Sequence, residues 1–359
     1  MFETEDAMAQ YRLIAEWEPQ AAVMLTWPHA ATDWEPLLEA VTQLYTELAW
    51  HICRFSSVLI AAPGSIHADI IQRLVERGVP RHKVQLYAVA SDDTWARDHG
   101  PLSVKCGDRS QLLDFQFNGW GGKFDASQDN AISKALAKGG AFNVPLESID
   151  FVLEGGAIET DGEGTLMTTR SCLLNANRNG GISQHEVETV LQRYFGVSKI
   201  NWLDHGFLEG DDTDSHIDTL ARLCPGQRIL YVGCPDERDV HYDALAKMKQ
   251  QLHEFRDAND RPYELIELPW PQAVYSANGE RLPATYANFL ILNGAVLAPI
   301  YQDPADALAL RKIGEAFPGY EVIGIDCRVL IEQHGSLHCI TMQLANLEPS
   351  TKPQTEGAF

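Results

Sequence analysis

The sequence is poor in basic residues. Its 359 residues include 28 Lys and Arg against 50 Asp and Glu, which gives a formal net charge of -22. A nucleic-acid-binding surface needs basic side chains to neutralise phosphates, so this balance argues against a nucleic-acid partner. An acidic cleft would attract a cationic ligand, although an ordinary acidic surface is the simpler explanation of the charge alone.

Paired cysteines and long apolar runs are also missing. The seven cysteines are scattered, and no two of them form a CxxC pair. This pattern indicates a reducing compartment and argues against a disulfide framework or a zinc site. No apolar run approaches the ~18 residues that span a membrane. The first 20 residues carry acids where a signal peptide needs a basic and then an apolar stretch. We therefore expect a cytoplasmic protein without a membrane partner.

Helical and strand patterns alternate along the chain without a low-complexity linker, which predicts an α/β fold. Apolar residues recur at helical spacing over 34–55, and short buried strands are expected at 58–62 and 84–88. Between these strands, a helix should end at Gly78. We expect one catalytic domain over 1–347, followed by a flexible tail over 348–359.

Turn and capping residues mark the ends of several elements. Two hairpins are predicted around Asp161–Gly164 and Asn293-Gly294. Ser183 and Glu186 form a capping box at the start of a helix. Asp303-Pro304 predicts another helix start, with the aspartate as N-cap and the proline at the first helical position.

Two acidic residues follow predicted strands beside turn-forming residues. Asp98 precedes Gly100-Pro101, and Glu154 precedes Gly155-Gly156, where glycine lets the backbone approach a ligand closely. The simpler alternatives are a solvated ion pair between Arg97 and Asp98 and a β-bulge with an exposed Glu154.

The segment 209–218 is the densest in polar side chains. His216 and Asp218 are two residues apart, so they would face the same way on a strand. A carboxylate beside a histidine stabilises the imidazolium, which suits a general acid or base. A calcium loop is excluded because no register places glycine at position six and glutamate at position twelve. Metal ligation by His216 and carboxylates stays open, although no second histidine lies at ligand spacing.

Cys339 ends the segment 332–339. A buried structural cysteine is the commoner role for any one of seven. Its neighbour His338 would point to the opposite face of a strand. A nucleophilic Cys339 would therefore take its base from elsewhere, and His216 with Asp218 is the best candidate.

These polar segments are evenly spaced. Asp98 and Glu154 are 56 residues apart, Glu154 and His216 are 62 apart, and His216 and Cys339 are 123 apart, about twice the other intervals. The spacing hints at similar α/β units arranged around one central site.

Taken together, the segments resemble the agmatine deiminase branch of the guanidine-modifying superfamily, with bacterial peptidylarginine deiminases close by. The resemblance runs from about Ala15 to Gln343. It rests on these segments, in order: AEWEPQAAVMLTWPH, DDTWARDHGP, FNGWGGKF, LEGGAIETDGEGTLMTTRSCLLNANRN, DDTDSHID, YANFLILNGAVLAPIY and HGSLHCIT.

The resemblance implies a five-bladed α/β propeller (pentein-like) with pseudo-fivefold symmetry and a central active site. It implies that Cys339 is the nucleophile and His216 the general acid/base. Asp98 and Asp218 would bind the guanidinium nitrogens, and Glu154 would orient His216 or the guanidinium. No metal or organic cofactor is implied, and a homo-oligomer is left open.

The implied reaction converts agmatine to N-carbamoylputrescine and ammonia through an amidino group on Cys339, a step of putrescine biosynthesis. By motif position, Asp212 would bind the tail ammonium. Trp95 and Trp120 are candidates to line the slot, because an aromatic face attracts cations, although loop packing explains Trp120 equally well. In the empty site the carboxylates should raise the pKa of the Cys339 thiol, and a bound cation should lower it.

Departures from the family pattern leave the substrate open. Relatives usually read GGGNIHC where this chain has Gln333-His334-Gly335-Ser336-Leu337-His338-Cys339, and they lack the Ala157 and Ser215 found here. Free arginine or peptidyl-arginine is the main alternative substrate. The alternatives from other functional classes are a cysteine protease or amidase, a metallohydrolase and a non-catalytic polyamine-binding protein.

Overall fold

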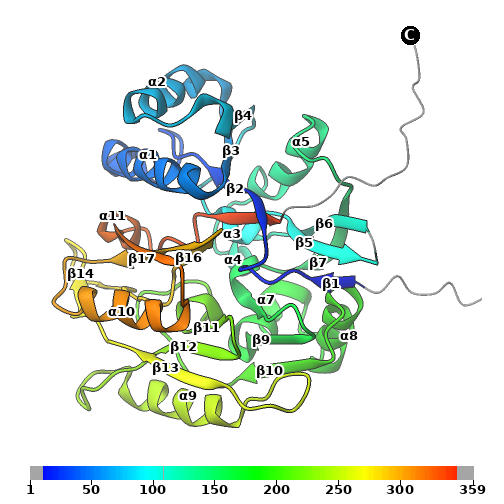
Figure 1. The fold of residues 1–359 in the computed structure, drawn as a ribbon, viewed down its shortest axis with the longest axis vertical. Helices are drawn as coiled ribbons and strands as arrows, with labels where there is room; N and C mark the ends of the chain where they lie inside the picture. The colour runs from blue at the N-terminus through cyan, green and yellow to red at the C-terminus, as the bar shows by residue number, and fades with distance from the viewer. Residues whose placement is uncertain (1–10, 108, 346–359) are drawn as a thin grey trace, which may run out of the picture.

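The computed structural model describes residues 11–107 and 109–345 (Figure 1). The tail expected at 348–359 lies outside these residues. Strands and helices alternate as predicted, and the strands form five sheets of three or four strands together with one two-stranded pair within the described ranges. The chain therefore has an α/β fold. No helix in the described part of the chain is long and apolar enough to cross a membrane.

Two of the sheets have four strands each. One sheet is built, in spatial order, from β19 (Met342–Ala345), β2 (Gln20–Thr26), β3 (Ser57–Ala62) and β4 (Val84–Ala88). The other is built from β1 (Tyr11–Leu13), β5 (Leu102–Cys106), β6 (Arg109–Gln116) and β7 (Leu146–Val152). Because β19 pairs antiparallel with β2, strands from opposite ends of the sequence share a sheet.

Three further sheets have three strands each. They contain β8 (Ile158–Thr160), β9 (Thr165–Thr169) and β10 (Lys199–Leu203); β11 (Ala221–Cys224), β12 (Arg228–Val232) and β13 (Glu264–Leu268); and β16 (Leu290–Leu292), β17 (Ala295–Ile300) and β18 (Glu321–Asp326). The two-stranded pair is β14 (Val274–Tyr275) and β15 (Arg281–Leu282).

Each of the five larger sheets contains the same unit. An antiparallel strand pair is followed by a helix and by a third strand parallel to the second. A parallel pairing requires such a crossover, and a helix is its usual form. The crossover helices are α1 (Leu38–Phe55), α5 (Ile132–Lys138), α8 (Gln184–Phe195), α9 (Tyr242–Glu254) and α10 (Asp306–Ala316). A further helix, α2 (His67–Arg77), joins β3 to β4.

Local sequence signals placed most element ends correctly. Gly78 ends α2 in the left-handed conformation (φ 85°), and Ser183 and Glu186 form the predicted capping box. Both predicted hairpins are present, as β8–β9 and β16–β17. The prediction for α10 is wrong in detail, because the helix begins at Asp306 with Ala305 as its N-cap. The carboxylate of Asp303 instead accepts the Ala305 N–H at 2.7 Å in the preceding turn.

The crossover helices bury an apolar face against the sheets. Helix α1 buries Val41, Leu48 and Ile52 fully, at the helical spacing that predicted it.

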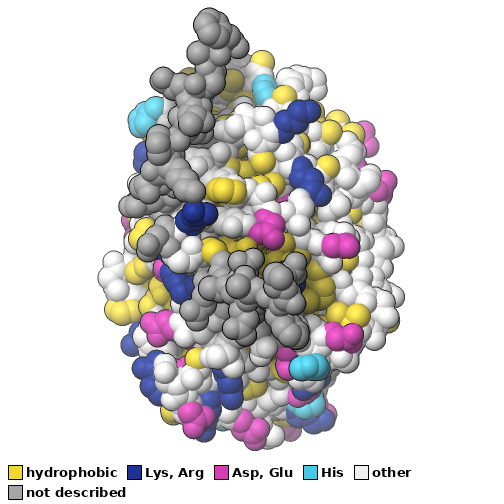
Figure 2. Space-filling view, turned by 90° about the vertical axis from the view of Figure 1, so that its right-hand side faces the viewer, with side chains coloured by type: hydrophobic (Ala, Val, Ile, Leu, Met, Phe, Trp, Pro, Cys, Tyr) yellow, Lys and Arg dark blue, Asp and Glu magenta, His cyan; other side chains and the backbone are white. Residues whose placement is uncertain are grey.

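The surface is mixed in charge: on the face shown in Figure 2, acidic and basic side chains are interspersed.

Candidate active site

The five predicted catalytic residues all lie in links between one unit and the next, whereas Trp120 lies inside a unit, between β6 and β7. Asp98 is in the short helix α3 (Ala96–His99), between β4 and β5, and Glu154 lies between β7 and β8. His216 and Asp218 lie between β10 and β11, and Cys339 lies between β18 and β19. Because these links carry the five residues, the evenly spaced segments of the sequence correspond to equivalent places in the repeated unit.

A cavity of about 300 Å³ opens over these links. Its lining includes Cys339, Asp98, Trp95, Trp120 and Asp212, all singled out from the sequence. Three further aspartates, Asp33, Asp93 and Asp211, also line it. The cavity is therefore strongly acidic, and a cysteine thiol lies in its wall.

Asp98 is buried and held through both carboxylate oxygens. Its Oδ2 accepts the indole N–H of Trp120 at 2.9 Å, and its Oδ1 accepts the backbone N–H of Gly156 at 3.0 Å. The predicted alternative of a solvated ion pair with Arg97 is wrong, because Arg97 pairs with Glu16 at 2.8 Å. Burial, followed by the charges of Asp218 and Glu154, raises the pKa of Asp98 well above its usual value.

Three site residues converge on Gly156. A Cβ atom at this position would lie 2.6 Å from Nδ1 of His216, 2.9 Å from Oδ1 of Asp98 and 3.1 Å from Oδ2 of Asp218. Any side chain here would displace a titratable group, so only glycine fits. Glycine at this position thus lets three site side chains approach the backbone closely.

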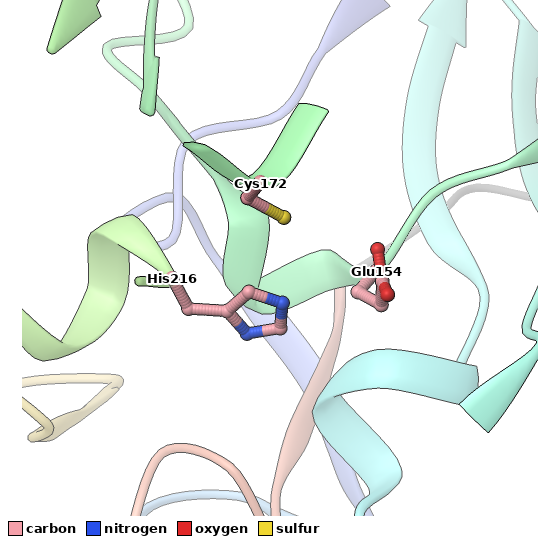
Figure 3. A group of neighbouring side chains, drawn as sticks. All are labelled: Glu154, Cys172 and His216. Atoms are coloured by element: carbon pink, nitrogen blue, oxygen red, sulfur yellow. The ribbon is translucent and has the colours of Figure 1, made fainter. Parts of the chain in front are cut away.

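Glu154 is fully buried, so the predicted alternative of an exposed residue on a β-bulge is wrong. Its two oxygens accept hydrogen bonds from Nε of Arg178 at 2.9 and 3.1 Å. Figure 3 shows Glu154, Cys172 and His216 gathered around a common space. Burial raises the pKa of Glu154, and the charge of Arg178 opposes this rise.

Among the residues that the structure describes, two groups of side chains are spaced closely enough to hold a metal ion: Glu154, Cys172 and His216, and Glu16, Glu159 and His338. In the first group, Arg178 already pairs with Glu154 at 2.9 Å. In the second, Arg222 pairs with Glu16 at 2.8 Å and also with Glu159. These buried guanidinium groups supply the positive charge that a metal ion would bring.

His216 has no hydrogen-bond partner at either ring nitrogen within the described residues. It precedes the 3₁₀ turn η6 (Ile217–Thr219), so the strand geometry assumed for His216 and Asp218 is wrong. Its Nδ1 lies 3.7 Å from Oδ1 of Asp98. Burial outweighs the attraction of Asp218 and lowers the pKa of His216 to about 3, so the imidazole is neutral.

Cys339 lies in a turn and not on a strand, in contrast to the geometry assumed from the sequence. Its Sγ is 3.3 Å from Oδ1 of Asn288, which also accepts the Cys339 N–H at 3.3 Å. Burial, followed by the charges of Asp218 and Asp98, raises the pKa of this thiol well above its usual value. The direction agrees with the expectation for an empty, carboxylate-rich site.

Sequence reasoning missed Asn288 as a site residue. It lies in the link between β15 and β16, the one link between units to which no site residue was assigned. The sequence did contain a signal for such a residue. The interval between His216 and Cys339 is about twice the other intervals, which leaves room for one more unit and one more site residue between them.

Comparison with known proteins identifies the family. The model of the Porphyromonas-type peptidyl-arginine deiminase family matches residues 12–345. The chain belongs to this family. A Medicago truncatula agmatine deiminase is 32% identical, covering 93% of this chain and 96% of its own length.

Solved structures of other deiminases have the same fold. A substrate-bound agmatine deiminase from C. jejuni with a cysteine-to-serine change is 38% identical, with a TM-score of 0.86 over 93% of this chain and 96% of its own. A candidate arginine deiminase from Porphyromonas gingivalis is 47% identical, with a TM-score of 0.87 over 94% and 98%.

Two basic residues of this deiminase, Lys123 and His334, act on the cavity residue Asp212. Lys123 donates hydrogen bonds to the backbone oxygen of Asp212 and, at 3.0 Å, to Oδ1 of Asp214. His334 lines the cavity and has a left-handed backbone conformation (φ 65°). Burial raises the pKa of Asp212, and the charges of His334 and Lys123 oppose this rise.

The two tryptophans have distinct roles in the deiminase site. Trp95 donates its indole N–H to Asp93 at 2.8 Å, and its ring lies directly against Gly335, where no Cβ would fit. Trp120 does not only pack within its loop, because its indole N–H donates a hydrogen bond to Asp98. Its backbone has a left-handed conformation (φ 55°). Both rings line the cavity.

Proposed function

We propose that this chain hydrolyses agmatine to N-carbamoylputrescine and ammonia. The observation that carries the proposal is the cavity in which the Cys339 thiol faces a wall of carboxylates. A guanidinium is planar and cationic, and carboxylates match its hydrogen-bonding geometry. Relatives 32% and 38% identical to this chain are named agmatine deiminases.

The acidic lining favours agmatine over arginine. Asp33, Asp93, Asp98, Asp211 and Asp212 line the cavity, and no described lining residue is a lysine or arginine. A tail ammonium is attracted by such a wall, whereas the carboxylate of free arginine is repelled. Arginine is the second candidate, because a structure 47% identical to this chain is named as a candidate arginine deiminase.

The reaction begins with attack on the guanidinium carbon. Asp98 and Asp218 hold the cation, whose charge lowers the pKa of the nearby Cys339 thiol. The thiol loses its proton, and the sulfur forms a bond to the central carbon. Neutral His216 takes up the proton and delivers it to one guanidinium nitrogen. The C–N bond then breaks, ammonia leaves, and a cationic amidino-thioether remains on Cys339.

Hydrolysis returns the enzyme to its starting state. His216, neutral again after the departure of ammonia, accepts a proton from water, and the oxygen adds to the amidino carbon. The C–S bond breaks, the added hydroxyl gives up its proton as the ureido carbonyl forms, and the sulfur regains one proton. His216 releases the second proton to solvent, where it converts the ammonia to ammonium. Glu154, whose oxygens are held in place by Arg178, orients His216 or the guanidinium when the substrate is bound. A positioned acid/base group of this kind contributes about 10²–10⁴-fold to the rate.

We also propose that the five units are the blades of a propeller with pseudo-fivefold symmetry around this site. The repeated strand–strand–helix–strand order and the location of site residues in successive links support this arrangement. The β19–β2 pairing supports it too, because it joins the last strand of the chain to the first unit.

The test is an assay of ammonia and ureido product from agmatine, arginine and a blocked arginine peptide. Cys339→Ala is compared with Cys106→Ala, which alters a cysteine at the end of β5. Turnover of agmatine alone, lost only in Cys339→Ala, would support the proposal. Turnover of arginine or the peptide would favour the alternative substrate. Agmatine binding without ammonia release would indicate a polyamine-binding protein, and activity in Cys339→Ala would contradict the nucleophile.

A further inference from the structure

His338, the neighbour of Cys339, is enclosed between two carboxylates. Its Nδ1 lies 2.7 Å from Oδ2 of Asp218, and its Nε2 lies 2.8 Å from Oε1 of Glu16. The imidazole is fully buried. A buried ring with a carboxylate at each nitrogen cannot rotate without breaking a charge-assisted hydrogen bond.

The hydrogen bond to Asp218 is the same in each protonation state that fits these contacts. Arg222 also lies 3.1 Å from Nε2 of His338. In one state Nε2 accepts from Arg222 and the ring is neutral, and in the other Nε2 donates to Glu16 and the ring is an imidazolium. In both states Nδ1–H donates to Asp218, because an ionised carboxylate only accepts.

This contact leaves one oxygen of Asp218 for the ligand. Oδ2 is occupied by His338, whereas Oδ1 is buried and has no hydrogen-bond partner within residues 11–107 and 109–345. A buried, unpaired carboxylate oxygen is costly and calls for a donor. The N–H groups of a guanidinium supply that donor. We propose that His338 is a positioning residue that turns Asp218 so that Oδ1 faces the substrate.

Glu16 fixes His338 and ties it to the rest of the site. Its carboxylate also accepts from Arg97 at 2.8 Å, Arg222 at 2.8 Å and Gln343 at 3.0 Å. Arg97 is the chain neighbour of Asp98, as His338 is of Cys339. One carboxylate from the start of the chain therefore holds partners in the links that carry Asp98 and Cys339, and in β11, the strand that follows the link carrying Asp218.

The electrostatics of Asp218 agree with this role. Burial acts to raise the pKa of Asp218, but the hydrogen bond from His338, followed by the attraction of His338, His216 and Arg222, outweighs it, so that the pKa lies below its usual value. Asp218 is therefore ionised, in contrast to Asp98, whose pKa is raised. Loss of the Nδ1 donor should raise the pKa of Asp218 and move the acidic limb of the activity profile to higher pH.

This inference rests on the proposed deimination and is tested with three substitutions. The amide nitrogen of His338→Asn can take the place of Nδ1 and keep the donor to Asp218. That of His338→Gln takes the place of Nε2 and keeps only the contact with Glu16. His338→Ala removes both. We expect kcat/KM for agmatine to fall about 10–100-fold in the Gln and Ala variants and less than about 10-fold in the Asn variant.

The pH profile and the thermal midpoint separate positioning from folding. The acidic limb of kcat/KM should move to higher pH in His338→Gln and stay in place in His338→Asn. Equal losses in the Asn and Gln variants, or losses that follow only the thermal midpoint, would overturn the inference. If His338→Gln does not fold, the comparison of Asn with Ala decides in the same way.

A measurement without turnover separates this inference from the proposed function. The pH midpoint of Cys339 alkylation by iodoacetamide should shift in His338→Gln, because Asp218 acts on the thiol, and remain unchanged in His338→Asn. A wild-type chain that turns over neither agmatine nor arginine would contradict the proposed function, and the alkylation comparison would then decide on His338. Identical midpoints in all variants would overturn the positioning role.

Discussion

The side-chain oxygen of Asn288 lies 3.3 Å from the sulfur of Cys339 and accepts the backbone N–H of His338 at 2.9 Å. Through these contacts Asn288 fixes both the turn that carries the cysteine and the direction of the thiol. Its own Nδ2 donates to the backbone oxygen of Asp218 at 3.4 Å. A neutral amide thus holds two links together without adding another negative charge beside the thiol.

Asn288→Asp keeps the size of the side chain and introduces a carboxylate next to Cys339. The added charge should raise the pKa of the thiol, so the pH optimum of kcat should move to higher pH and kcat at pH 7 should fall about 10-fold or more. The measurement is kcat against pH. Asn259→Asp, on the exposed surface, is the control for added charge. An unchanged optimum would argue against the role of Asn288.

Gly156→Ala places a methyl group where His216, Asp98 and Asp218 converge. At least one of these groups must move, so we expect kcat/KM to fall by about 10³-fold or more, since misplacement of about 1 Å costs about 10²-fold for a single group. Gly314→Ala, in α10 with its nearest neighbour at 3.8 Å, should leave activity unchanged and stabilise the fold slightly. Equal activity in both variants would contradict the convergence.

Trp120→Phe keeps an aromatic ring in the cavity wall but removes the N–H that binds Asp98. A hydrogen bond to a charged group is worth about 1.5–3 kcal/mol, which corresponds to a loss of about 10–100-fold in kcat/KM. Steady-state kinetics with agmatine check this value. If the ring served only as packing, the variant would behave as wild type.

His99 and His216 are neutral in the folded protein, because burial lowers the pKa of each to about 3. In the unfolded chain they take up protons below about pH 6.5. The unfolded state therefore binds more protons between about pH 6.5 and 3, and folding stability falls as the pH falls through this window. Each histidine contributes about 1.4 kcal/mol per pH unit there.

The measurement for these histidines is the free energy of unfolding between pH 4 and 7. His99→Gln keeps a polar side chain beside Thr26, the partner of His99 at 3.2 Å, but removes one titrating group. Its stability should fall less steeply with decreasing pH than that of the wild type. Parallel curves for the two proteins would show that His99 does not titrate as its burial implies.

Elements with local causes were predictable from the sequence. Gly78 ends a helix because glycine adopts the left-handed conformation at little cost. Ser183 and Glu186 satisfy each other's backbone N–H groups, and Asn293-Gly294 forms a tight hairpin turn. Where the local signal was ambiguous the prediction failed, as at Asp303, whose carboxylate binds in the turn before α10 and does not cap the helix.

The sequence by itself determined the α/β class, the family and the residue types of the site, because a motif records which side chains are present. Only the tertiary structure decided what each of them contacts. It made His338 a partner of Asp218, brought Arg178 to Glu154 and placed Asn288 beside Cys339. It also made His216 neutral, because burial depends on packing that no local spacing specifies. These contacts join residues 24 to 120 positions apart, and only the packing of the units brings them together.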